Sequence, residues 1–213
     1  MVDFKVVPEQ MALINVDMQN CFVEGSPISA VDGLAVMDRI NRLSAVCRDA
    51  GILVVHTRFV LRSDGSNMGV LGMLAPPVKA GILNRGADSA ALHPRLVVGS
   101  EDILLDKPRF GAFHGTDLEM TLRSRGMDTI IISGIATNVC CETTAREAMV
   151  RDFKVFFLSN GTSTATMGNA SAAELQKASL ATLGFLFAQV ITVDEMIRQI
   201  NQAVSRKGSR GRS

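Results

Sequence analysis

Six short apolar runs, separated by helix-like stretches, limit most strongly how this 213-residue chain can fold. Each run has the length of a buried strand and is too short for a buried helix. Strands that alternate with helices favour an α/β fold, because parallel strands need long crossover connections. We therefore predict a mostly parallel sheet with helices on both faces, a three-layer α-β-α arrangement. The predicted strands are residues 11–16, 52–55, 102–105, 129–133, 154–158 and 188–193.

The segments between the strands predict helices and one irregular excursion. Residues 61–100 are interrupted by Gly, Pro, Ser and Asn, with at most a short helix near 68–74. Long loops inside compact domains are often functional. We expect a single domain over residues 1–204 and a basic flexible tail over residues 205–213. The predicted helices are residues 33–50, 116–125, 140–150, 171–183 and 194–204.

The composition argues against several classes of function. The formal net charge is +1, so no strong field attracts nucleic acid or a membrane surface. No apolar run approaches the ~20 residues of a membrane-spanning helix, and the N-terminus lacks a signal-peptide pattern. We expect a cytoplasmic protein that acts on a small molecule, with no nucleic-acid partner and no membrane partner.

Reactive side chains follow three of the predicted strands. Asp17 follows the first strand, Lys107 the third, and Cys140 comes six residues after Gly134. The carboxyl ends of parallel strands meet at one edge, so an acid, an ammonium and a thiol should meet there. A lysine and a helix N-terminus both lower a thiol's pKa, and Asp17 could accept the thiol proton. Backbone N–H groups of Ala136 and Cys140 would form an oxyanion hole.

This set of groups predicts covalent catalysis by a thiolate. The expected reaction is attack on an amide-like carbonyl carbon, loss of ammonia or an amine, and hydrolysis of the resulting thioester.

Three motifs in this order resemble the isochorismatase-like cysteine hydrolases, over roughly residues 8–200. Asp17-Met18-Gln19-Asn20 is similar to the opening motif of that family, and Lys107-Pro108-Arg109-Phe110 is similar to its lysine segment. Gly134-Ile135-Ala136-Thr137-Asn138-Val139-Cys140 is similar to its nucleophile turn. One departure is Cys21, which stands where the family often has Asp.

The resemblance carries expectations about fold and site. It implies a Cys140–Asp17–Lys107 triad and a Rossmann-like, six-stranded sheet in the order 3-2-1-4-5-6. It implies a cis peptide bond between Ile135 and Ala136. It also implies a homo-oligomer, either a dimer or a tetramer.

The resemblance further implies the reaction class. The nucleophile turn resembles that of ureidoacrylate amidohydrolases, and residues 111–119 resemble a stretch of N-carbamoylsarcosine amidohydrolase. Both imply hydrolysis of a linear, non-peptide C–N bond in an amide, ureido or carbamoyl compound. Nicotinamidases of this family carry a metal-binding Asp-x-His pair near the end of the second strand. His56-Thr57-Arg58 lacks that pair, so we expect no metal and no cofactor.

Other side chains near the same edge are candidates for substrate binding. Phenylalanines could wall a pocket for a small flat molecule, and arginines such as Arg58 or Arg109 could hold a carboxylate. Ordinary core packing and surface ion pairs are the alternatives for these residues. The candidates are Gln19, Phe22, Arg58, Phe110, Phe113, Thr137 and Asn138.

Several alternatives stay open. The same fold could serve a non-catalytic ligand-binding protein or a nicotinamidase-type amidase. A base among His56, His93 and His114, or a redox role for Cys140 and Cys141, is less favoured by the spacing. Slow alkylation at pH 6–7 would favour the binding protein, because an activated thiolate reacts faster.

Overall fold

A single six-stranded sheet forms the centre of the protein. The structure is a computed structural model that describes the backbone of residues 2–210 and the side chains of residues 2–207. All neighbouring strands are parallel, and their order is β3-β2-β1-β4-β5-β6, which confirms the predicted fold. The strands are β1 (Met11–Val16), β2 (Leu53–Phe59), β3 (Ile103–Lys107), β4 (Thr129–Ile135), β5 (Lys154–Ser163) and β6 (Gln189–Ile191).

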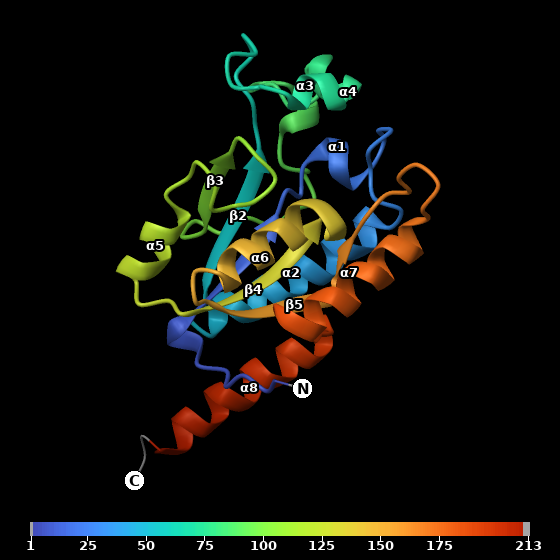
Figure 1. The fold of residues 1–213 in the computed structure, drawn as a ribbon. Helices are drawn as coiled ribbons and strands as arrows, with labels where there is room; N and C mark the ends of the chain where they lie inside the picture. Colours follow the sequence, from blue (N-terminus) through green and yellow to red (C-terminus); the bar gives the residue numbers. More distant parts are fainter. Residues whose placement is uncertain (1, 211–213) are drawn as a thin grey trace.

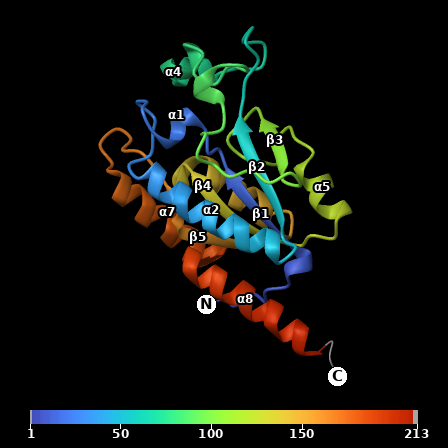
Figure 2. The same cartoon turned by 180° about the vertical axis from the view of Figure 1, so that it is seen from behind.

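Helices cover both faces of this sheet. Helices α5, α6 and α7 lie on the face turned to the viewer in Figure 1, and α2 lies on the face seen in Figure 2. Helix α8 packs with α2 on the second face, below the sheet in both views. The helices are α1 (Asn20–Val23), α2 (Gly33–Asp49), α3 (Leu71–Leu74), α4 (Pro76–Lys79), α5 (Leu118–Ser124), α6 (Glu142–Met149), α7 (Ala172–Leu186) and α8 (Val193–Arg210), with short turns η1 (Pro8–Gln10), η2 (Asp88–Ala90) and η3 (Thr137–Cys141).

The central strand β1 shows why the apolar runs become buried strands. Its side chains alternate between the two helical layers: Leu13 packs on the α2 and α8 side, and Ile14 packs on the α5–α7 side. All six residues are buried, as expected for a parallel strand that is covered on both faces. The polar exception, Asn15, is satisfied by hydrogen bonds to Ser44, His56 and Ser133.

Four strands, β2 to β5, continue further at their carboxyl ends than the sequence predicts, whereas β6 is shorter than the predicted 188–193. For β2 and β3 the difference matters for the site. Strand β2 continues to Phe59 and β3 continues to Lys107, because these two residues pair across the ladder. The predicted ends, residues 55 and 105, are the positions where the two apolar runs stop. Pairing between strands therefore places Lys107 inside the sheet rather than in a loop beyond it.

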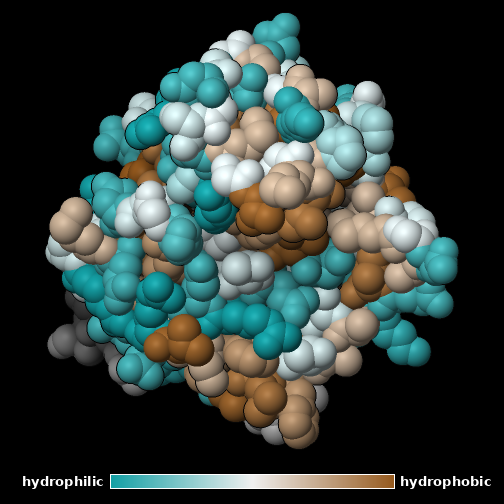
Figure 3. All heavy atoms as spheres, turned by 45° about the horizontal axis from the view of Figure 1, so that its top comes forward, coloured by the Kyte–Doolittle hydropathy of each residue, from teal (hydrophilic) through white to brown (hydrophobic). Residues whose placement is uncertain are grey.

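Residues 61–90 rise above the carboxyl ends of the strands, with α3 and α4 at the top of Figure 1, and residues 95–99 return along α2. The predicted short helix near 68–74 corresponds to α3 (Leu71–Leu74), whereas α4 and η2 were not predicted. Figure 3 turns this end of the molecule toward the viewer, and apolar side chains gather near its centre. The exposed apolar residues of the excursion include Val70, Met73 and Leu74.

Two local predictions differ from the structure. The capping box predicted at Thr116 does not form: Asp117 is the N-cap residue of α5, and the Thr116 hydroxyl donates to the Ala112 carbonyl at 2.6 Å and accepts the Leu118 N–H at 3.3 Å. The last helix was predicted to end near residue 204, but α8 continues to Arg210, and Lys207 pairs with Glu9. The expected flexible tail is therefore helical over residues 205–210, and residues 211–213 lie outside the described part. No helix within the described residues has the length and apolar character needed to cross a membrane.

Gly134 pairs with Val16 of β1 near the end of β4, and it allows a test of how closely the two strands pack there. Its φ of 121° suits glycine, and a Cβ there would lie 2.1 Å from the Val16 carbonyl oxygen. We expect Gly134→Ala to lower the free energy of unfolding in urea by about 3 kcal/mol or more. Gly126→Ala is the control, with φ of 71° and open space around it, and should cost about 1–2 kcal/mol. Equal losses in the two variants would contradict the packing described here.

Candidate active site

A buried ion pair lies where β1 ends and β3 ends. Lys107 Nζ is 2.7 Å from Asp17 Oδ2, and both side chains are 0% exposed. The ammonium also donates to the carbonyl oxygens of Arg109 and Phe110, at 3.0 and 2.9 Å. It stands 4.6 Å from the centre of the Phe59 ring. Three oxygen atoms and one aromatic face therefore replace the water that this ammonium loses on burial.

Thr57, on β2, fixes the carboxylate. Its hydroxyl donates to Asp17 Oδ1 at 2.6 Å and accepts the Asp17 backbone N–H at 3.1 Å. Asp17 itself has a positive φ of 51°, so the chain turns sharply as it leaves β1. Thr57 was not among the residues predicted for the site. Its place near the end of a strand that neighbours β1 was the only signal.

The Cys140 thiol completes this cluster. Cys140 lies in the π-helical turn η3 that precedes α6, rather than in the first turn of a regular helix as predicted. It is 4% exposed, and both Asp17 and Lys107 lie close enough to its thiol to shift the thiol's pKa. The structure thus brings the three residues of the expected triad together.

The pKa of the thiol differs from the sequence-based expectation. Burial, with a further contribution from the Asp17 carboxylate, outweighs the Lys107 ammonium and raises the pKa of Cys140 to about 12. Burial alone would lower the pKa of Lys107, but Asp17 and Cys140 raise it above its usual value. At neutral pH the cluster therefore contains a protonated thiol and a charged lysine. A protonated thiol is alkylated slowly at pH 6–7 whether or not it is a nucleophile. Slow alkylation therefore cannot distinguish the enzyme from the non-catalytic binding protein.

The turn before Cys140 brings several backbone groups near the thiol. The Ile135–Ala136 peptide bond is cis, and the Ala136 carbonyl accepts the N–H groups of Val139 and Cys141, both at 3.1 Å. Thr137 is fully buried, and its hydroxyl has no hydrogen-bond partner among the described residues. A buried hydroxyl without a partner is costly, so it marks a position where a ligand or water could bind.

Four of the predicted substrate-binding residues are engaged elsewhere. The Gln19 side-chain amide donates to the carbonyl oxygens of Phe59 and Ala90 and accepts the Phe59 N–H. These bonds hold the two backbone segments together and leave the amide without a free group for substrate. Arg58 pairs with Asp106 at 2.7 Å. These partners lie far apart in the sequence, so no local pattern reveals them.

Phe113 and Asn138 are likewise occupied. Phe113 is buried against Phe153, with ring centres 5.7 Å apart, which is core packing. Asn138 accepts a hydrogen bond from the Thr164 hydroxyl at 2.6 Å, in the loop after β5.

Phe22 and Phe110 keep partly accessible rings. Phe22 is half-buried between two apolar clusters, and Phe110 is 38% exposed with its edge against the Phe59 ring, 5.6 Å between centres. Cys21 is buried near Asp17, and burial raises the pKa of its thiol to about 12. The Arg109 guanidinium donates from Nη1 to the carbonyl oxygens of Asn67 and Pro108.

The histidines contact other partners. His56 lies between Asn15 and Asp102, with Nε2 2.8 Å from an Asp102 oxygen, and burial lowers its pKa. His93 lies 3.0 Å from Glu24, and His114 is exposed. Among the side chains described, no group of three His, Cys, Asp or Glu residues could hold a metal ion.

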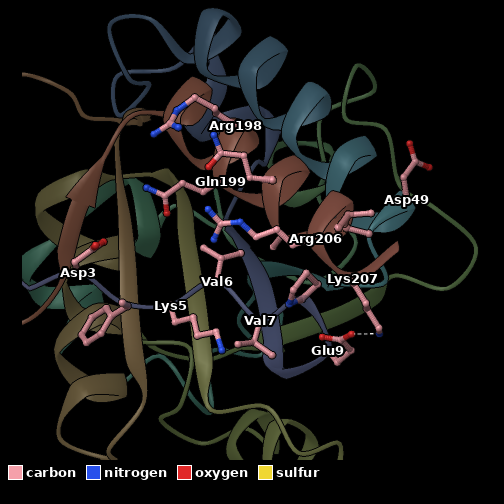
Figure 4. Close-up of a pocket in the computed structure, with 16 residues that line it drawn as sticks. Asp3, Lys5, Val6, Val7, Glu9, Asp49, Arg198, Gln199, Arg206 and Lys207 are labelled. Atoms are coloured by element: carbon pink, nitrogen blue, oxygen red, sulfur yellow. Dashed lines mark hydrogen bonds and ion pairs between the residues drawn. The ribbon is translucent and has the colours of Figure 1, made fainter. Parts of the chain in front are cut away.

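One open cavity lies away from this cluster. It occupies about 840 Å³ between the N-terminal segment and α8, at the opposite end of the sheet (Figure 4). Its labelled side chains include Lys5, Glu9, Arg198 and Lys207. None of the lining residues belongs to the cluster around Cys140, so this cavity is not the candidate active site.

Comparisons with known proteins agree with the fold. The model of the isochorismatase domain family matches residues 11–195. Nicotinamidase 3 of Arabidopsis thaliana is 30% identical over 191 residues, 89% of this chain and 88% of that protein. The ureidoacrylate amidohydrolase RutB of Methylorubrum extorquens is 34% identical over 171 residues, 70% of this chain and 68% of that protein.

Among solved structures, the fold resembles a cysteine hydrolase from Pseudomonas syringae pv. phaseolicola. The TM-score is 0.89 and the identity 36%, over 95% of this chain and 97% of that chain.

Asp17 allows a test of the electrostatics. The carboxylate raises the pKa of Cys140, so Asp17→Asn should lower it and move the alkylation of Cys140 to lower pH, by roughly one to three pH units. The measurement is the rate of iodoacetamide labelling of Cys140 between pH 6 and 11, read by peptide mass spectrometry. Glu119→Gln, a surface change on α5, serves as the control. A profile that stays in place or moves to higher pH in Asp17→Asn would refute this account.

Proposed function

The chain belongs to the isochorismatase family, and from this premise we propose that it is a cysteine-dependent amidohydrolase of small molecules. It would cleave a linear C–N bond in an amide, ureido or carbamoyl compound through a thioester. The observation that carries this proposal is the fully buried Asp17–Lys107 ion pair in contact with the Cys140 thiol.

In the first half of the reaction, the Asp17 carboxylate takes the thiol proton as Cys140 sulfur attacks the substrate carbonyl carbon. The carbonyl oxygen gains negative charge, which the N–H groups of Ala136 and Cys140 receive. The protonated Asp17 then gives its proton to the leaving nitrogen. The C–N bond breaks, and ammonia or an amine leaves behind a thioester on Cys140.

In the second half, Asp17 takes a proton from a water molecule whose oxygen attacks the thioester carbon. The C–S bond breaks, the proton returns to sulfur, and the acid product leaves. Lys107 stays protonated throughout, because Asp17 and Cys140 raise its pKa. Its role is to stabilise the thiolate and to hold Asp17 in place.

Because the resting thiol is protonated, the reaction needs an event that removes its proton. Asp17 lies at the thiol, and substrate that displaces water would strengthen the attraction between Lys107 and the developing thiolate. The nucleophile is thus generated when substrate is present, rather than kept as a free thiolate.

The substrate class follows from the relatives and from the groups left free near the thiol. The named activities of the relatives concern nicotinamide and ureidoacrylate, both small molecules. We propose that the rings of Phe22 and Phe110 and the unpartnered Thr137 hydroxyl contact the substrate. The half-exposed Phe rings suit a flat amide or ureido group.

We further propose that the chain forms a homo-oligomer, a dimer or tetramer, as the family resemblance implies. The four cysteines are free thiols, which supports a reducing compartment such as the cytoplasm.

The test is ammonia release from a panel of nicotinamide, ureidoacrylate, N-carbamoyl amino acids and simple amides, with wild type, Cys140→Ala and Cys140→Ser. We expect a loss of about 10³-fold or more in kcat/KM for both variants, because the covalent step is gone. Intact-protein mass spectrometry of the wild type under turnover should detect an acyl group on Cys140.

Cys47→Ala is the matched control, since Cys47 is a buried thiol on α2, on the other face of the sheet. Full activity in Cys140→Ala would refute the proposal. Tight binding of a panel compound by the wild type without turnover would instead favour the non-catalytic binding protein.

A further inference from the structure

The segment that follows Lys107 is tied to the helix that follows Cys140. Thr144 lies on α6, four residues after Cys140, and its hydroxyl donates to the Cys140 carbonyl oxygen at 2.7 Å. The same hydroxyl oxygen accepts the backbone N–H of Ala112 at 3.1 Å. Thr144 and Ala112 are both 0% exposed. A single buried hydroxyl therefore joins the backbone of the nucleophile to the lysine segment.

A second contact lies one turn further along α6. The Glu147 carboxylate accepts the Phe113 backbone N–H at 3.1 Å. A Cβ on Gly111 would lie 2.1 Å from the same carboxylate, so residues 111–113 pack directly against α6. The segment is thus fixed to one face of the helix, at positions 144 and 147.

The position of this segment decides where the lysine ammonium stands. Lys107 Nζ is held by the carbonyl oxygens of Arg109 and Phe110, which immediately precede the residues tied to α6. Three hydrogen bonds and a short stretch of backbone form a closed circuit. The Thr144 hydroxyl bonds the Cys140 carbonyl and the Ala112 N–H, the backbone leads from Ala112 to Phe110, and the Phe110 carbonyl accepts from the Lys107 ammonium, which acts on the Cys140 thiol.

A threonine hydroxyl that bonds only to the carbonyl four residues earlier is common in helices and needs no functional reading. Thr144 differs because its second partner is a buried N–H from a distant segment. Removing the hydroxyl leaves that N–H without a partner, so the segment must move or find a new acceptor. Any such movement carries the two carbonyl groups that hold Lys107.

We propose that Thr144 is a positioning residue that sets the place of the Lys107 ammonium relative to the Cys140 thiol. The inference rests on the proposed function, because Lys107 matters for rate only if Cys140 is the nucleophile. Thr144 does not touch the substrate. It acts through the segment at residues 109–112, so its loss should slow the chemical step and leave substrate binding largely intact.

The experiment compares Thr144→Val and Thr144→Ala, which remove the hydroxyl, with Thr144→Ser, which keeps it. Thr143→Val is the matched control, since Thr143 is the adjacent threonine on α6 and its hydroxyl is not part of the circuit. The readouts are kcat and KM on the best substrate of the panel, with thermal unfolding and circular dichroism to establish the folded fraction. Thr144→Ala preserves helix propensity and provides the test if Thr144→Val folds poorly.

We expect kcat to fall about 10- to 100-fold in Thr144→Val and Thr144→Ala, with KM within about threefold of wild type. Thr144→Ser and Thr143→Val should keep kcat within about threefold. A kcat per folded molecule close to wild type in both hydroxyl-free variants would overturn the inference. So would a loss confined to KM, or an equal loss of kcat in Thr144→Ser.

Failure of the inference about Thr144 can be distinguished from failure of the proposed function. If Cys140→Ala keeps the activity of the wild type, the proposed function is wrong and the inference about Thr144 goes with it. If Cys140→Ala is inactive and the Thr144 variants behave like Thr143→Val, only the inference about Thr144 is wrong.

Discussion

The fully buried Asp17–Lys107 ion pair is the constraint on which the rest of the site depends. Removing two opposite charges from water costs several kcal/mol per ion, and only close pairing and further hydrogen bonds offset that cost. The Thr57 hydroxyl supplies such a bond to the carboxylate, and the backbone carbonyl groups of Arg109 and Phe110 accept two from the ammonium. The order of the strands makes this possible, because β2 lies between β1 and β3 and contributes Thr57 beside the carboxylate and Phe59 beside the ammonium.

The same burial determines the state of the thiol. A buried sulfur next to a carboxylate keeps its proton, even with an ammonium in contact. The proposed enzyme therefore rests as a neutral thiol beside an ion pair. Its reactive form depends on the geometry of the cluster rather than on a free thiolate. Contacts from β2 and from residues 109–110 hold Lys107 and Asp17 in that geometry.

Local signals were sufficient to predict a parallel α/β fold and three reactive residues at one edge of the sheet, whereas the strand order and the triad were expected from the family resemblance. Apolar runs mark parallel strands, and reactive residues at strand ends meet at one edge. Side-chain partners were not predictable in this way. Gln19, Arg58 and Phe113 were expected at the substrate but bond or pack elsewhere, and Thr57 was overlooked. The hydrogen-bond partners of these residues lie 34 to 71 positions away in the sequence, so only the folded chain brings them together.

The most direct test of the central claim is the free energy of unfolding of wild type, Asp17→Asn, Lys107→Met and the double variant, measured in urea. If the two charges form one buried unit, each single variant loses about 3–5 kcal/mol, because it leaves the other charge without a partner. The double variant then loses less than the sum of the two, by about 2 kcal/mol or more. Losses that simply add would show that the two side chains act independently, and would contradict this account.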